Sequence, residues 1–264
     1  MVAGMIGLGI FIVLVIISPY ITPYDPYKMG SDVLVCLGKD GHILGTNHMG
    51  QDVLSMILYG MRTSLQVGII SALISGILGA IIGGLAGYLG GKTDAVVSEI
   101  INIFMMLPTF FLILMIIALF GSNIYNVMIV IGITTWPSNA KLMRAQALSI
   151  KKRTYVNAAK SLGETKKQIL FKYIIPNGIF PVIANTTVGM SNAILTEASL
   201  SFLGLGDPNV ISWGHMIYDG KAYITTGWWV SAFAGLAIII TVIIFYLIGD
   251  GLNHIMNPKI NVKE

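Results

Sequence analysis

Long apolar runs separated by short polar segments dominate the pattern of the chain. A helix that spans a bilayer needs about 20 consecutive apolar residues, and six runs approach that length. The pattern therefore predicts six membrane-spanning helices, the first over residues 1–20 and five more within a core of residues 63–255. Those five are expected near residues 64–89, 95–120, 124–140, 177–195 and 229–248.

The first apolar run, residues 4–17, is short for a span and must tilt or use its flanks. No basic residue precedes it, and it ends at Ser18-Pro19-Tyr20 rather than in a small-x-small cleavage site. We therefore expect a retained membrane helix and not a cleavable signal peptide.

Residues 21–62 form the longest stretch that mixes charged and turn-forming residues. Pro19, Pro23 and Pro26 are expected to stop the first helix, because proline cannot continue the helical hydrogen-bond ladder. The stretch is therefore predicted to be an extracytoplasmic loop. Its last part, residues 51–62, is expected to form a short helix along the membrane surface.

Four glycines recur every four residues at the end of the second predicted span: Gly79, Gly83, Gly87 and Gly91. At helical spacing they form a groove in which a second helix backbone can approach closely. We expect this groove to serve helix packing, and a moving hinge is the alternative.

Two other predicted spans depart from a plain apolar helix. Pro108 lies inside the third span and is expected to kink it. Glu197 lies near the outer end of the fifth span, where an intramembrane charge is costly and often functional; a capping or packing role is the alternative. The fifth span also contains four polar residues that are candidates for the lining of a pathway: Asn185, Thr187, Ser191 and Asn192.

The composition agrees with a membrane bundle. Hydrophobic residues make up 55% of the chain and charged residues 11%, against about 25% charged in ordinary soluble domains. The mean hydropathy is +0.80. We therefore predict an all-α polytopic membrane protein that forms one bundle. The single cysteine, Cys36, excludes an internal disulfide.

The basic residues are distributed unevenly, and this explains the net charge of +4 better than binding to nucleic acid. Of the 16 Lys and Arg residues, nine lie between Lys141 and Lys172, where only Glu164 opposes them. By the positive-inside rule this region is cytoplasmic. Six spans then place both chain ends in the cytoplasm, including a tail of residues 256–264.

Two kinds of functional site are disfavoured. The segment that ends in Gly91-Lys92-Thr93 resembles a phosphate-binding loop, but Ala86 stands where that motif requires its first glycine. The four histidines show no metal-ligand spacing. His42 and His48 could meet a metal substrate on the outer loop, although satisfied surface histidines are the favoured interpretation. No catalytic site, metal site or cofactor is expected in this chain.

Residues 157–176 form a basic, amphipathic stretch between two predicted spans. Ala158 and Ala159 offer a flat face, Leu162 adds apolar contact, and Gly163 allows a turn. The stretch could rest on anionic lipid or dock on a partner protein, and its physical chemistry does not separate the two.

The motifs of the chain resemble those of a known family. Ala158-Ala159, Gly163 and Pro176 match the "EAA" loop of ABC-importer permeases in spacing, with Asn157 at the position of the motif glutamate. Further blocks resemble the dipeptide, oligopeptide and nickel permeases, closest to the second permease of each pair; they are LGTNHMGQDVLS from residue 44, GYLGG from residue 87, EASLSFLGLG from residue 197 and GDGL from residue 249.

The resemblance implies a type I ABC importer permease fold in a prokaryotic inner membrane. It implies four partners besides lipid: a homologous permease, two cytoplasmic ATPase subunits that bind ATP and Mg²⁺, and an extracytoplasmic solute-binding protein. It also assigns a coupling loop that docks on the ATPases, with contacts from six residues: Asn157, Ala158, Ala159, Leu162, Gly163 and Pro176.

Some positions depart from the family pattern. Glu99 and Asn102 stand on the third span where an arginine and an aspartate often occur, so an Arg–Asp pair cannot form there. Gln51 replaces the arginine of the family's Gly-Arg-Asp, and the terminal Asp-Pro-Arg reads Asn257-Pro258-Lys259.

We predict a peptide substrate, with nickel or a metal chelate as the alternative within the same role. The competing class is a secondary transporter driven by an ion gradient, which would favour paired intramembrane charges and broken helices. A membrane scaffold without transport is disfavoured by the polar fifth span.

Overall fold

The computed structural model describes residues 1–256, and residues 257–264, which include most of the predicted tail, lie outside the described part. Within that part the only regular elements are helices, which confirms the all-α prediction. Their order along the chain is α1 (Val2–Ile21), α2 (Val53–Leu89), α3 (Gly91–Met106), α4 (Thr109–Phe120), α5 (Ile124–Ile150), α6 (Thr154–Ser161), α7 (Lys166–Ile169), a π-helical turn (Leu170–Ile174), α8 (Ile175–Gly178), α9 (Phe180–Phe202), α10 (Trp213–Lys221) and α11 (Trp228–Met256).

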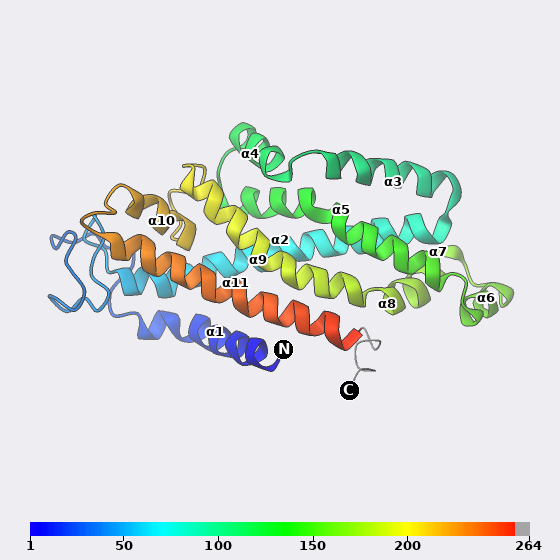
Figure 1. Cartoon of the computed structure of the whole chain (residues 1–264), viewed down its shortest axis with the longest axis horizontal. Coiled ribbons are helices and arrows are strands. Elements are labelled where there is room, and N and C mark those ends of the chain that lie inside the picture. The colour runs from blue at the N-terminus through cyan, green and yellow to red at the C-terminus, as the bar shows by residue number, and fades with distance from the viewer. Residues whose placement is uncertain (257–264) are drawn as a thin grey trace.

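The longest helix, α2, runs along the whole bundle (Figure 1). Its 37 residues correspond to about 55 Å at 1.5 Å per residue, which exceeds the apolar thickness of a bilayer. Asp52 caps its N-terminus by accepting a hydrogen bond from the Ser55 backbone N–H. The separate surface helix predicted over residues 51–62 is therefore wrong, because residues 53–62 are the first turns of α2.

The two ends of the bundle differ (Figure 1). One end, which we call the loop end, holds residues 22–52 and α10. The opposite end, which we call the basic end, holds α6, α7 and α8. Helices α2, α5, α9 and α11 connect the two ends, and α1 packs along α11.

The glycine groove of α2 lies against α5. A β-carbon at Gly79 would overlap Asn139, one at Gly83 would overlap the Ala140 carbonyl, and one at Gly87 would overlap Arg144. The two backbones therefore touch along three turns. Gly91 does not share this role, since a β-carbon there would meet nothing within 4 Å. It begins α3 with φ +55° instead, in the left-handed region that glycine favours.

Two breaks bend the apolar segments. The axes of α3 and α4 differ by 85° across Leu107 and Pro108, a larger change than the expected kink. The segments Lys166–Gly178 and Phe180–Phe202 meet at 61°. Proline explains the first break, because it removes a backbone donor and restricts the residue before it. Pro19, in contrast, lies inside α1, which continues to Ile21.

Three of the described helices, α1, α2 and α11, are long and apolar enough to cross a membrane. If each bent pair counts as one span, the number among the described residues rises to five. Helix α5 has the length of a span, with 27 residues, but polar residues near its centre lower its hydropathy. A multi-pass membrane protein is therefore clear from length and composition.

The close approach of α2 and α5 generates a prediction about stability. Gly83→Ala should destabilise the protein by about 2 kcal/mol, because a methyl group there has no space between two backbones. Thermal unfolding of the purified protein in detergent measures the change. Gly235→Ala on α11 is the matched control, since its β-carbon would meet nothing within 4 Å. Equal melting temperatures for the two variants would contradict the packing.

Candidate functional site

A polar cavity of about 270 Å³ lies between α2, α5 and α9. Among the described residues that line it, none is Asp, Glu, Lys, Arg or His. Its polar chemistry is therefore that of neutral hydroxyl and carboxamide groups, and Ala72, Ile131, Val188 and Ala193 add apolar wall between them. The polar lining consists of Ser71, Ser75, Thr135, Ser138, Asn139, Asn185, Thr186, Asn192 and Thr196.

A chain of hydrogen bonds links the three helices at this cavity. Asn185 Nδ2 of α9 donates to Asn139 Oδ1 of α5 over 2.8 Å. Asn139 Nδ2 in turn donates to Ser75 Oγ of α2 over 3.0 Å. Asn139 is buried, so its carboxamide needs both partners. Such bonds between helices stabilise a bundle in lipid and fix the orientation of each side chain.

Helical periodicity explains why α9 contributes so many polar groups to one face. Asn185, Gly189, Asn192 and Thr196 are separated by four, three and four residues, so they fall on one side of the helix. All four positions line the cavity. The glycine leaves open space at the centre of this face, since a β-carbon there would meet nothing within 4 Å.

The structure brings together only part of the predicted pathway set. Asn185 and Asn192 line the polar cavity. Thr187 instead donates to the Ile183 carbonyl and faces an apolar groove between α2 and α9. Ser191 is buried and donates to the Val242 carbonyl of α11, so it points away from the cavity.

Sequence reasoning missed the contributions of α2 and α5. Ser75 lies within the glycine-rich run of α2, and Asn139 follows Pro137 in α5. The available signal was the group of polar residues in the last part of the fourth predicted span, Thr134, Thr135, Ser138 and Asn139, because polar side chains are costly where they face lipid.

Glu197 lies outside the cavity and is 2% exposed. Its Oε1 accepts hydrogen bonds of 2.8 Å from Ser201 Oγ and from Ser212 Oγ. The loop before α10 is thereby attached to α9, and Gly214 packs directly against the carboxyl group. This location favours the packing alternative, because the carboxyl group faces α10 and not the cavity.

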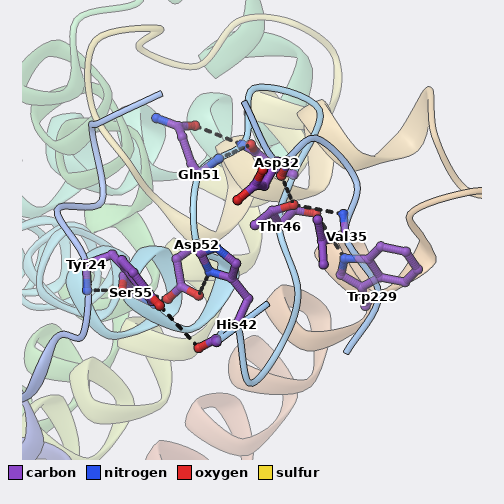
Figure 2. A network of polar contacts seen from close by, with 11 residues as sticks. Tyr24, Asp32, Val35, His42, Thr46, Gln51, Asp52, Ser55 and Trp229 are labelled. Atoms are coloured by element: carbon purple, nitrogen blue, oxygen red, sulfur yellow. Dashed lines mark hydrogen bonds and ion pairs between the residues drawn. The ribbon is translucent and has the colours of Figure 1, made fainter. Parts of the chain in front are cut away.

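The loop that precedes α2 is held by a second polar network (Figure 2). His42 Nδ1 lies 2.9 Å from Asp52 Oδ1, while the Ser55 hydroxyl donates to Asp52 Oδ2 and accepts from the Tyr24 backbone N–H. Across the loop, Trp229 Nε1 of α11 donates to the Thr46 carbonyl over 3.1 Å. The loop is thus fixed to the start of α2 and to α11.

His42 and His48 are both engaged within the protein. His42 is buried against Asp52, and His48 stacks on Tyr223 with ring centroids 4.9 Å apart. Among residues 1–256, no group of three His, Cys, Asp or Glu side chains could hold a metal ion. Both histidines are therefore satisfied within the protein, but His42 is buried and is not the surface histidine that was expected.

At the basic end, residues 157–176 fold as a helical hairpin and not as one helix. Helix α6 ends at Ser161, the chain turns at Gly163 with φ +83°, and α7 follows. One face of this hairpin packs on α5 in a shared apolar cluster. The buried residues of that cluster are Val156 and Ala159 of α6, Ile169, Leu170 and Ile174 of the returning segment, and Met143, Ala147 and Ile150 of α5.

The exposed side of the hairpin differs from the predicted contact face. Ala159 is 3% exposed and packs inside the chain, so it cannot offer a surface to a partner. Ala158 and Asn157 are exposed, and Leu162 is 84% exposed at the tip. Pro176 is exposed within α8, two helical segments away. Among the predicted contact residues, the exposed apolar surface is therefore Leu162 with Ala158 beside it.

An ion pair and a hydrogen bond connect the basic end of α5 to α3 and α2. Arg144 Nη2 donates to Asp94 Oδ2 of α3 over 2.8 Å. Lys151 Nζ donates to the Gly87 carbonyl of α2 over 2.7 Å. An Arg–Asp pair thus exists, although Glu99 and Asn102 exclude it at the position where the family often has one.

Glu164, next to the tip of the hairpin, connects the turn to the returning segment through hydrogen bonds. Its Oε1 accepts from the Tyr173 hydroxyl over 2.8 Å and from Lys172 Nζ over 3.1 Å. The Tyr173 hydrogen bond, followed by the Lys172 contacts, lowers the pKa of the Glu164 carboxyl below its ordinary value of 4.5.

This shift predicts how the hairpin responds to pH. Because the folded-state pKa is lowered, the stabilisation by Glu164 is present above pH 4.5 and is lost as the pH falls through the folded pKa. Glu164→Gln should therefore speed hydrogen exchange of the hairpin amides at pH 7. The difference from the unmodified protein should vanish at acidic pH. A difference that does not change with pH would contradict the role of the carboxylate.

Comparisons with known proteins agree on one family. Residues 75–262 match the family model described as "Binding-protein-dependent transport system inner membrane component". The chain is 38% identical to a dipeptide transport system permease protein of Escherichia coli (strain K12), over 98% of this chain and 89% of that protein. It is 34% identical to a glutathione transport system permease protein of Pectobacterium atrosepticum, over 97% of this chain and 87% of that protein.

Solved structures resemble the fold. A chain of the MetNI methionine ABC transporter in an inward-facing conformation matches with a TM-score of 0.61 at 19% identity, over 76% of this chain and 96% of that chain. A chain of an amino acid ABC transporter matches with a TM-score of 0.55 at 16% identity, over 75% of this chain and 92% of that chain.

Proposed function

The chain belongs to the family of binding-protein-dependent transport system inner membrane components, and from this we propose that it is one of two permease subunits of an ATP-driven peptide importer. It is a transporter subunit and not itself an enzyme. The 38% identity to a dipeptide permease over nearly the whole chain is the observation that most supports the peptide substrate. Two further relatives, a probable D,D-dipeptide permease and a di/tripeptide permease, also support a peptide substrate.

The proposed topology has six spans: α1, α2, the α3–α4 pair, α5, α9 and α11. Helix α5, the fourth of these along the chain, raises the number of spans from five to six, and the cavity that it lines accounts for its polar centre. The basic end faces the cytoplasm, because nine of the 16 Lys and Arg residues lie between Lys141 and Lys172. The loop end then faces the outside, and both chain ends lie in the cytoplasm.

The proposed partners follow from this orientation. A homologous permease completes the pathway within the bilayer, and a solute-binding protein delivers peptide to the loop end. Two ATPase subunits dock at the basic end, and they bind the ATP and Mg²⁺ that this chain has no motif to hold. The tip of the hairpin, with Leu162 and Ala158, is the proposed docking surface, because it is apolar, exposed and surrounded by lysines.

The packing of the hairpin explains how docking reaches the pathway. The hairpin and α5 share one apolar cluster at the basic end. Helix α5 continues from that cluster to Asn139 at the polar cavity. A force on the tip therefore moves the helix that lines the cavity, which is the two-state coupling that an importer requires.

Leu162→Asp tests the docking surface. Burying a charge in the interface should cost about 2 kcal/mol or more, enough to weaken the ATPase complex roughly 30-fold. The ATPase subunits should then fail to co-purify, and uptake of labelled dipeptide into vesicles should be lost. Thr154→Asp is the matched control, because it places the same charge on an exposed position of α6. Wild-type uptake by Leu162→Asp would refute the assignment.

The substrate class is tested by competition. Unlabelled di- and tripeptides should abolish uptake of a labelled dipeptide, whereas a nickel chelate should leave it unchanged. The alternative of nickel or metal-chelate transport predicts no uptake of the labelled dipeptide and uptake of the labelled chelate instead. No feature of the described residues favours metal, since His42 and His48 are both engaged within the chain.

A further inference from the structure

The polar cavity between α2, α5 and α9 holds hydrogen-bonding groups that the protein itself does not satisfy. Asn185 uses its Nδ2 in the bond to Asn139, and no described residue donates to its Oδ1. The Asn192 carboxamide makes no hydrogen bond to any described side chain or backbone group. Thr186 Oγ1 is buried without a partner. Asn185 is partly exposed and Asn192 is exposed, so the free groups of both are accessible to a polar ligand at the cavity, and the buried Thr186 Oγ1 carries the cost of an unpaired polar group.

The chemistry of the lining selects the class of that ligand. A charged group would need an opposite charge, and none of the described residues that line the cavity carries one. Hydroxyl and carboxamide groups can both donate and accept hydrogen bonds. They suit a neutral ligand that presents one donor and one acceptor, as a secondary amide does.

The size of the cavity agrees with such a ligand. A water molecule occupies about 30 Å³ in the liquid, so 270 Å³ corresponds to roughly nine waters. This volume accommodates a peptide unit with its two flanking carbons. The open face of the cavity, where Asn192 and Ser138 are exposed, leaves the charged ends of a peptide outside.

We propose that this cavity is a binding subsite for the peptide bond of the substrate, read by the carboxamides of Asn185 and Asn192. The Asn139–Ser75 chain holds Asn185 in the orientation that presents its oxygen. The subsite thus selects for the amide group common to all peptides, whatever their side chains. This inference rests on the proposed function, because it takes peptide as the substrate.

The test uses a neutral probe that needs no transport. N-acetylglycine methylamide carries two secondary amides and no charge, and N-acetylglycine methyl ester retains only one of the two amide N–H groups. Binding of each to the assembled complex in nanodiscs is measured by ligand-observed NMR. The amide probe should bind, the ester should bind more weakly, and Asn185→Leu should weaken amide binding about tenfold, as expected for one lost hydrogen bond.

Two further variants keep the result interpretable. Asn192→Leu removes a side chain that bonds nothing in the described structure, so it should fold normally and also weaken the probe. Thr187→Val is the control, because Thr187 faces the apolar groove and bonds its own helix. Equal binding by Asn185→Leu, Asn192→Leu and the unmodified complex would overturn the subsite. Absence of probe binding by the unmodified complex, leaving a cavity filled with water alone, would also overturn it.

Failure of the subsite and failure of the proposed function give different results. If the complex binds the amide probe with the predicted variant pattern but carries no peptide into vesicles, the proposed function fails and the subsite stands. If the complex carries peptide and Asn185→Leu leaves probe binding unchanged, the subsite fails and the proposed function stands.

Discussion

Helices within a bilayer gain little by hiding apolar side chains from lipid, so close packing and hydrogen bonds must hold them together. In this protein the contact of α2 with α5 supplies both. Gly79, Gly83 and Gly87 let the two backbones touch, and this approach brings Ser75 within 3.0 Å of Asn139. With larger residues at the glycine positions the helices would separate, and the polar cavity would lose two of its three walls.

The same helix pair joins the two ends of the molecule. At the basic end, Lys151 and Arg144 tie α5 to α2 and α3, and the hairpin packs on α5 through an apolar cluster. At the loop end, Asp207 accepts from the Ile124 backbone N–H at the start of α5. Both ends of α5 are therefore fixed to neighbours, which is the arrangement that the proposed coupling from the hairpin to the cavity requires.

Much of the helical framework could be predicted from the sequence, because apolar length and positive charge act locally. The all-α class, the break at Pro108 and the glycine contact follow from residue type and spacing alone. Which residues are buried depends on tertiary contacts, and this explains why Ala159 was wrongly predicted to contact a partner. Ala159 shares its small size with Ala158 but lies on the inner face of the hairpin. The prediction of a separate surface helix over residues 51–62 was wrong because no helix-breaking residue separates this segment from the rest of α2.

The candidate site was only half predictable for the same reason. Asn185 and Asn192 share the face of α9 that lines the cavity, whereas Thr187 and Ser191 lie on other faces. Which face meets the cavity depends on how α9 is rotated against α2 and α5, and the sequence does not give that rotation. Asn139 was not predicted, because the polar residues of the fourth predicted span had been given no role. Glu197 was a candidate because it is an ionisable residue within an apolar span. Its hydrogen bonds from Ser201 and Ser212 instead favour a role in packing α9 against the start of α10.

In the proposed role, this chain couples peptide movement to ATP hydrolysis by its partners. Uptake of labelled dipeptide into vesicles that hold the full complex and ATP tests it most directly. Ionophores that collapse the proton and sodium gradients should leave uptake unchanged, and vanadate should abolish it. Uptake that stops with the ionophores and persists with vanadate would contradict this role and indicate a gradient-driven transporter.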